Sequence, residues 1–244
     1  MDDPTNRKCR LTQGRYFVVL ASLLVLGGLS FIVDYPVANW MAGDRLHHIL
    51  TGDTYGVVRL GESFAHGIVV CLISLLIVRL DKRGWRVFPF LATSSLGAGI
   101  LANFCKLLIA RARPSKHHLI GVVWNSFGSW FPTDVGYDLQ SFPSAHTAVA
   151  VGFAVALTRL YPRGAGFFSF FAALAILQRL DVGAHYVSDV VFGAMIGVLV
   201  SGLVAKWAPR LVEHPEADGN LESRGASESG RVQTFQDTPS EQAA

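Results

Sequence analysis

The chain has 244 residues, of which 51% are hydrophobic and 16% are charged, and its formal net charge at pH 7 is +3. Its mean hydropathy is +0.37, and its uncharged apolar runs are longer than those of ordinary soluble helices. This composition argues against a soluble globular protein and favours an integral membrane protein.

Apolar segments along the chain predict the membrane-spanning helices. The two longest runs without a charge are Tyr16–Val33 and Val87–Cys105, with 18 and 19 residues, and at about 1.5 Å per residue each can cross a bilayer. Taken alone, the shortest of the remaining runs could equally be buried core helices. We predict an all-α fold, a polytopic membrane bundle of six transmembrane helices within residues 16–208. The four shorter runs are Phe64–Val78, Thr147–Thr158, Gly164–Gln178 and Val190–Ala205.

The two ends of the chain differ from this bundle in composition. Residues 1–15 form a basic flank, which we predict to be a cytoplasmic N-terminal segment. The first apolar run is interpreted as an uncleaved anchor, because it is longer than the core of a signal peptide and no clear cleavage site follows it. Beyond Ala208 the chain is rich in Glu, Ser, Gly, Asp and Pro, which predicts a disordered cytoplasmic tail over residues 209–244.

Lys and Arg are distributed unequally between the predicted loops. Many lie near residues 7–15, 79–86, 159–163 and 206–210, whereas the first loop on the other side, about 35–62, contains only two. The positive-inside rule then predicts that both termini are cytoplasmic. The cations left on the outer side need another explanation: Lys106, Arg111, Arg113, Lys116 and Arg179.

The first polar segment on the outer side is KLLIARARP, residues 106–114. On a continuing helix Lys106 and Arg113 would face the same way two turns apart, and Pro114 would end the helix near Arg113. Lys106 lies deep in an apolar run, where a cation is costly without a partner, so we predict a functional role for it. Arg111 would point elsewhere and is interpreted as a side chain that reaches the lipid headgroups.

The second polar segment is FPSAHTAVA, which begins at Phe142. Pro143 is placed to be the first residue of a helix, which would leave the amide of Ser144 and those that follow free to hold an anion. His146 lies in the same first turn, close enough to give a proton to a bound group. An ordinary helix cap with a bystander histidine is the alternative interpretation.

The third polar segment, QRLDVGAHYVSD, joins the last two apolar runs. His185 and Asp189 are four residues apart, so at the start of a helix the carboxylate would lie within reach of the imidazole. A carboxylate that holds one ring nitrogen leaves the other as a nucleophile. Arg179 offers a planar fork suited to phosphate oxygens. The three segments together predict a phosphate site with its own nucleophile and acid.

With these residues in view, the chain resembles the type 2 phosphatidic acid phosphatases over about residues 16–208. Gln178 departs from the pattern of that family, which mostly has serine there, and Ala145 stands where the family mostly has glycine. The matching positions are Lys106 with Arg113-Pro114, then Pro143-Ser144-Ala145-His146, and then Arg179, His185 and Asp189, separated by five and three residues.

The resemblance implies a PAP2/haloperoxidase-like helical core and a two-step phosphatase reaction that uses no metal or other cofactor. His185 would attack phosphorus to form a phosphohistidine, and Asp189 would orient it. His146 would protonate the leaving oxygen and then activate water. The phosphate ligands would be Lys106, Arg113, Ser144 and Arg179.

A site at the outer surface of a bilayer suits a phosphate on a lipid whose tails stay in the membrane. The resemblance implies a phosphatase of the bacterial inner membrane with a periplasmic active site, and lipid A 1-phosphate is the leading candidate substrate. Phosphatidylglycerophosphate and undecaprenyl pyrophosphate are alternatives. A headgroup phosphotransferase and a non-catalytic binder or transporter of anionic lipids remain open as other classes. No nucleic-acid partner is indicated, and the sequence does not specify an oligomeric state.

Overall fold

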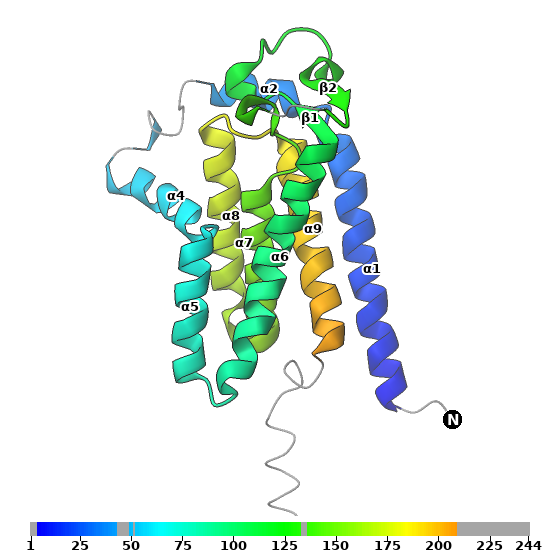
Figure 1. The fold of residues 1–244 in the computed structure, drawn as a ribbon, viewed down its shortest axis with the longest axis vertical. Coiled ribbons are helices and arrows are strands. Elements are labelled where there is room, and N and C mark those ends of the chain that lie inside the picture. Colours follow the sequence, from blue (N-terminus) through cyan, green and yellow to red (C-terminus); the bar gives the residue numbers. More distant parts are fainter. Residues whose placement is uncertain (1–3, 43–48, 51, 133–135, 209–244) are drawn as a thin grey trace, which may run out of the picture.

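Long helices lie side by side in the computed structural model of the protein, which describes residues 4–42, 49–50, 52–132 and 136–208 (Figure 1). Each of the six predicted apolar runs lies largely within one of these helices, so the helical structure of the runs is confirmed. They are α1 (Pro4–Ser30), α5 (Gly67–Leu80), α6 (Val87–Leu108), α7 (Ala145–Leu160), α8 (Ala165–Asp181) and α9 (Val187–Trp207).

Not all of these helices are long and apolar enough to cross a membrane by themselves. Among the described residues, two helical segments are long and apolar enough to cross a membrane, Gly84–Leu108 and Val187–Trp207. Two bent pairs would raise the number to four: residues 16–30 with 34–41, bent by 71°, and residues 55–64 with 67–80, bent by 76°. The structure therefore supports an all-α membrane fold with two to four candidate spans.

Large apolar side chains on the outside of the bundle agree with a lipid environment, since a soluble monomer rarely exposes so many. Among those that are more than half exposed are Leu24, Ile68, Leu72, Ile100, Phe104 and Phe167.

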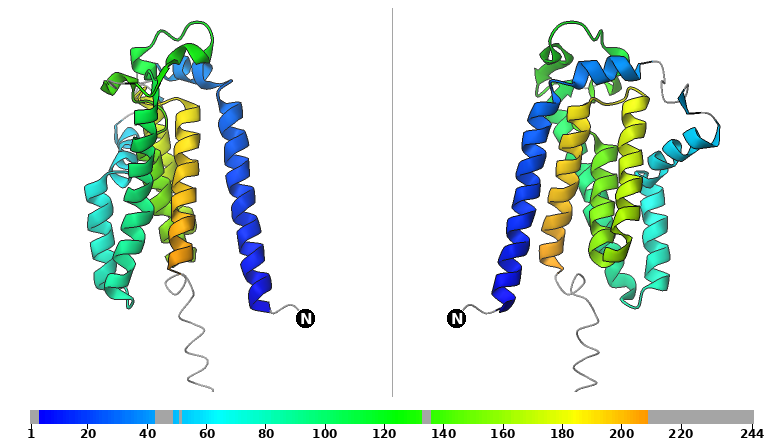
Figure 2. Two further views of the ribbon diagram at one scale, coloured as in Figure 1. Left: turned by 45° about the vertical axis from the view of Figure 1, so that its right-hand side comes forward. Right: turned by 180° about the vertical axis from the view of Figure 1, so that it is seen from behind.

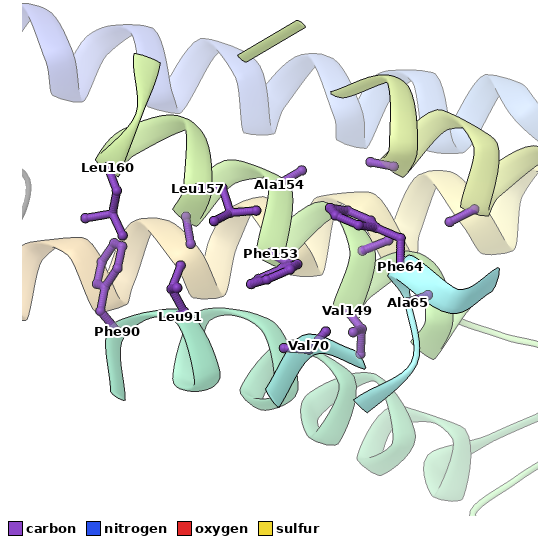
Figure 3. Close-up of a cluster of buried hydrophobic side chains, with 14 of the residues drawn as sticks. Phe64, Ala65, Val70, Phe90, Leu91, Val149, Phe153, Ala154, Leu157 and Leu160 are labelled. Carbon is purple, nitrogen blue, oxygen red and sulfur yellow. The ribbon is translucent and has the colours of Figure 1, made fainter. Parts of the chain in front are cut away.

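Helix α7 lies at the centre of the bundle, in contact with α6, α8 and α9. Glycines bring the backbones close: a Cβ at Gly152 would lie 2.3 Å from the Ser94 carbonyl oxygen of α6, and one at Gly197 of α9 would lie 2.8 Å from the Ala148 carbonyl oxygen. Small residues of this kind let membrane helices pack closely. Phe64 and Phe153 belong to the main buried cluster beside α7 (Figure 3).

Helix α1 stands at the edge of the bundle and packs against α9 (Figure 2). The Tyr16 hydroxyl donates to the Val198 carbonyl oxygen at 2.6 Å, which ties the two helices together. Residues 4–15, predicted as a segment separate from the membrane domain, continue the same helix. The predicted tail, residues 209–244, lies outside the described residues.

Shorter elements cover one end of the bundle, drawn at the top of Figure 1. Helix α2 (Asp34–Met41) lies across this end, and α4 (Asp53–Phe64) packs against α8. A small antiparallel ribbon, which the sequence did not predict, pairs β1 (Ile109–Arg111) with β2 (Phe127–Trp130). Three 3-10 turns lie in the chain between α6 and α7 at this end: η2 (Pro114–Lys116), η3 (Val123–Ser126) and η4 (Tyr137–Leu139). Two more lie at the other end (Figure 1), where η1 (Gly84–Arg86) joins α5 to α6 and η5 (Pro162–Gly164) joins α7 to α8.

Two predicted helix boundaries are wrong. Helix α6 ends at Leu108 instead of continuing to Arg113, because the chain becomes extended at Ile109 and pairs with β2. Helix α7 begins at Ala145 with Ser144 as its N-cap, so Pro143 precedes the helix instead of opening it. The peptide bond before Pro143 is cis.

Candidate active site

The predicted site residues come together where four helix ends meet. Lys106 lies in the last turn of α6, His146 in the first turn of α7 and Arg179 in the last turn of α8, while His185 immediately precedes the cap of α9. His146 lies within electrostatic range of Arg179, His185 and Lys106. Arg113 lies within electrostatic range of Arg179 and Asp189. Residues up to 83 positions apart in the sequence, from 106 to 189, therefore share one site.

The imidazole of His185 is only 3% exposed and is held by one main-chain contact. Its Nδ1 lies 2.7 Å from the carbonyl oxygen of Ser141. Because a carbonyl oxygen can only accept, Nδ1 must carry the proton, and Nε2 is left with a lone pair. Burial lowers the pKa of His185 below its ordinary value, so the ring is neutral at pH 7. His185 is therefore available as a nucleophile.

Asp189 orients this ring indirectly, which corrects the direct contact that the spacing predicted. Its Oδ2 lies 3.7 Å from His185 Nδ1, beyond hydrogen-bond distance. The same oxygen accepts from the Ser141 hydroxyl and from the Tyr186 amide, the latter at 2.8 Å. The difference arises because α9 begins at Val187, so His185 lies before the helix instead of one turn below Asp189. Ser141 thus links the two, with its hydroxyl on the carboxylate and its carbonyl on the ring.

Arg111 is fully buried, so its predicted role at the lipid headgroups is wrong. Its guanidinium donates through Nη1 to Asp189 Oδ1 and through Nη2 to Asp34 Oδ2, the latter at 2.7 Å. Nη1 also donates to the Ser188 hydroxyl at 2.7 Å. The guanidinium carbon lies 4.1 Å from the centre of the Tyr186 ring. Arg111 therefore joins the carboxylate of α9 to one on α2.

Asp34 completes this buried network and was missed in the sequence. Its Oδ1 accepts from the Ser188 amide at 2.9 Å, and its Oδ2 accepts from the Ser188 hydroxyl at 2.6 Å. One signal in the sequence was available: Asp34 is an acid directly after the first apolar run, on the same predicted side as the excess cations. A buried cation needs such a partner.

Two arginines of the site are held by specific contacts. Arg113 donates from Nε to the Tyr137 carbonyl oxygen at 3.1 Å, and its guanidinium carbon lies 3.8 Å from the centre of the Tyr137 ring. Burial lowers the pKa of Arg113 from its ordinary value. Arg179 donates from Nη2 to Glu62 Oε1 at 2.8 Å and from Nε to Gln178 Oε1. Contacts within the protein therefore hold both side chains in place.

Ser144 does not offer the free amide that the sequence predicted. Its amide donates to the Asp189 carbonyl oxygen at 3.0 Å, and its hydroxyl accepts from the Thr147 amide at 3.3 Å. Ser144 is therefore the N-cap of α7 and a bridge to α9. With Ser144 as the N-cap, Ala145 and His146 are the first two helical residues, whose amides have no acceptor within an α-helix.

A cavity of about 290 Å³ opens beside His146. Helix α6 contributes Gly99 and Asn103 to it, α7 contributes Ala145, His146 and Val149, and the α4–α5 bend contributes residues 65–67. A larger cavity of about 560 Å³ lies under α2 and touches none of the predicted site residues. The cavity at His146 adjoins a predicted catalytic residue and is therefore a candidate place for the group bonded to a phosphate in the site.

Within the described parts of the chain, no group of three or more His, Cys, Asp or Glu side chains is arranged to hold a metal ion. Three cations lie within electrostatic range of His146 or His185: Lys106, Arg113 and Arg179. Cations in this arrangement can bind a phosphate, and a neutral imidazole beside them can attack its phosphorus.

Comparison with known proteins agrees with this chemistry. Residues 87–213 match the PAP2 superfamily. A lipid A 1-phosphatase of Rhizobium etli is 36% identical over 116 residues, which cover 48% of this chain and 48% of that protein. A lipid A 1-phosphatase of Rhizobium johnstonii is 37% identical over 108 residues, 44% of this chain and 42% of that protein. The match thus spans about half the length of these curated relatives. No solved structure matches the chain.

Proposed function

This chain belongs to the PAP2 superfamily, and we propose that it is an integral-membrane phosphatase that removes a phosphate from a lipid headgroup through a phosphohistidine. The observation that carries the proposal is the neutral, buried His185, whose Nδ1 is held by Ser141, placed among the cations of the site. Such a ring is a nucleophile poised beside an anion site.

In the first step, Nε2 of His185 forms a bond to phosphorus while the bond from phosphorus to the lipid oxygen breaks. His146, at the start of α7 beside the 290 Å³ cavity, gives its proton to that oxygen, and the lipid leaves through the cavity. Lys106, Arg113 and Arg179 hold the three equatorial oxygens as charge builds up on them. The amides of Ala145 and His146 take the place predicted for that of Ser144.

In the second step, water attacks the phosphorus of phosphohistidine. His146 has lost its proton in the first step and accepts one from this water. The bond between phosphorus and Nε2 then breaks, which releases inorganic phosphate and returns His185 to its neutral form. Asp189 lies 3.7 Å from Nδ1 and stabilises the positive ring of the intermediate.

We propose lipid A 1-phosphate as the leading substrate, supported by two relatives that bear the name lipid A 1-phosphatase. Phosphatidylglycerophosphate and undecaprenyl pyrophosphate are the alternatives, because they present the same phosphate chemistry at a membrane surface. A panel of the three substrates with purified protein in detergent distinguishes them by the release of free phosphate. Label that appears on a second lipid instead would support the phosphotransferase.

We further propose that α1, α5, α6, α7, α8 and α9 all cross the membrane, with the site on the periplasmic side of the inner membrane and both termini in the cytoplasm. The excess of Lys and Arg in the loops opposite the site supports this orientation. The start of α1 and the end of α9 lie at the opposite end of the bundle from α2 and the site (Figure 1).

Substitution of the two histidines tests the mechanism. His185→Ala removes the nucleophile, so neither turnover nor a labelled protein is expected. His146→Ala keeps the nucleophile, so a substrate with a good leaving group should phosphorylate His185 and leave the label trapped on the protein. Acid-labile label on His185→Ala would show that another residue is the nucleophile.

A further inference from the structure

Glu62 and Gln178 surround the guanidinium of Arg179, and the proposed reaction gives neither of them a task. Glu62 lies in α4, before the part of the chain that matches the PAP2 superfamily, and Gln178 lies next to Arg179 in α8. We infer that the two are positioning residues, which hold Arg179 in the orientation that binds phosphate. This inference rests on the proposed function, since it assigns Arg179 to the phosphate.

The hydrogen bonds leave one edge of the guanidinium available. Arg179 donates from Nε to Gln178 Oε1 and from Nη2 to Glu62 Oε1, so both contacts lie on the Nε side of the group. Gln178 Nε2 donates to Glu62 Oε2 at 3.2 Å, which closes a ring of three side chains. Within the described residues, these contacts leave the edge formed by Nη1 and the second Nη2 hydrogen for a bidentate bond to phosphate.

The backbone fixes Glu62 in this place. At the neighbouring Gly61, a Cβ would lie 2.3 Å from the carbonyl carbon of Leu174 in α8, so α4 and α8 touch through their main chains. Gln178 is four residues after Leu174 and therefore lies one turn further along the same face of α8. The contact at Gly61 thus sets Glu62 opposite Gln178, and the position of the carboxylate does not depend on a flexible loop.

The three linked side chains, Glu62, Gln178 and Arg179, counteract electrostatic repulsion in the site before substrate binds. Arg113 and Arg179 repel each other electrostatically, and Lys106 repels Arg113. Without an anion, this repulsion favours rotamers that take the long side chain of Arg179 away from the site. The Glu62 carboxylate offsets the repulsion from one side and leaves the phosphate-binding edge in place, so less order has to be gained on binding.

Vanadate binding tests the inference without any lipid. Purified full-length protein is titrated with vanadate, and the dissociation constant is taken from the rise in melting temperature. For Glu62→Ala we expect affinity to fall about 5-fold, as when a partly exposed ion pair is lost. Glu62→Gln keeps an acceptor for Arg179, so its loss of binding free energy for vanadate should be about half that of Glu62→Ala. Leu60→Ala, an exposed position on the same helix, should match the wild type.

A double substitution shows whether Glu62 acts through Arg179. In an Arg179→Ala background, Glu62→Ala should not lower the vanadate affinity any further, because the side chain that Glu62 positions is absent. With lipid substrate, Glu62→Ala and Gln178→Ala should raise KM more than they lower kcat. Full additivity of the two substitutions would overturn the inference. So would tighter vanadate binding by Glu62→Ala, because the carboxylate would then be competing with phosphate for Arg179.

The two proposals fail in different ways. If the wild-type protein binds vanadate but releases no phosphate from any lipid of the panel, the proposed function fails and the vanadate comparison still measures the positioning role. If the wild type hydrolyses lipid while the Glu62 variants bind vanadate as it does, only the positioning role is overturned.

Discussion

Replacement of Asp189 by asparagine separates the electrostatic role of this carboxylate from its structural role. The amide can still accept from the Ser141 hydroxyl and from the Tyr186 amide, so the contacts that orient His185 are kept. The change removes the negative charge that lies 3.7 Å from His185 Nδ1. The ring becomes positive when Nε2 bonds to phosphorus while Nδ1 keeps its proton. The substitution should therefore raise the free energy of the phosphohistidine and leave the neutral ring of the resting enzyme unaffected.

The distance sets the size of the effect. Two unit charges 3.7 Å apart attract by about 4 kcal/mol at an effective dielectric constant of about 20. If the transition state carries most of this charge, Asp189→Asn should slow phosphorylation of His185 by about 10³-fold. This is less than the loss of about 10⁴-fold known for a triad in which the carboxylate bonds directly to the histidine and sets its tautomer. Here the Ser141 carbonyl sets the tautomer.

Asp34→Asn is the matched control for this experiment. Asp34 is the other carboxylate on Arg111, and it is equally buried, but it makes no hydrogen bond or ion pair with His185 among the described contacts. Each variant breaks one buried ion pair, so both should lower the free energy of unfolding by a similar amount, about 3 kcal/mol.

Phosphorylation rates decide between the two roles. They are measured in single turnovers with a labelled substrate, below the melting temperature of both variants. Asp189→Asn should be slow, and Asp34→Asn should stay within about 10-fold of the wild type. Equal losses in the two variants would refute the electrostatic argument and assign the whole effect to the integrity of the Arg111 network.

Other predictions address the ligand, the topology and the pH dependence. Vanadate should inhibit turnover, because it mimics a pentacoordinate phosphoryl group, and activity should survive a chelator of divalent ions; complete loss that magnesium restores would contradict a metal-independent reaction. Topology reporters fused at Ala244 and within residues 119–141 should give opposite signals, and identical signals would contradict six spans. Burial lowers the pKa of His185 from 6.5, so in His146→Ala the phosphorylation of His185 should persist as the pH falls to 6.5 and be lost only below it. A midpoint above pH 6.5 would show that His185 is not shielded in this way.

The helices could be predicted because their information is local. Each apolar run is continuous in the sequence, and such a run forms a stable helix both in a bilayer and in a buried core, whichever helices it packs against. The grouping of His146, Arg179 and His185 could be predicted as well, since each adjoins the end of an apolar run and alternate loops lie on the same side of a membrane. Their electrostatic proximity in the structure agrees with that reasoning.

The covering elements could not be predicted in the same way, because their stability comes from contacts between distant segments. Arg111 illustrates this: helix periodicity placed it on the wrong side of α6, but pairing with β2 and the two buried carboxylates draws it into an extended strand. The same limit applies to Asp189 and His185. A spacing of four predicts contact only inside a helix, and α9 starts between them.

Two of the acids that pair with arginines of the site precede residues 87–213, the part of the chain that matches the PAP2 superfamily. Asp34 on α2 binds Arg111, and Glu62 on α4 binds Arg179. The matching segment contains the groups that would touch phosphate. Loss of Asp34 would leave the buried Arg111 only half neutralised, by Asp189. Loss of Glu62 would leave Arg179 a more mobile side chain. The N-terminal third of the chain is therefore more than a membrane anchor. It supplies two carboxylates, Asp34 and Glu62, that offset the repulsion among the cations of the site.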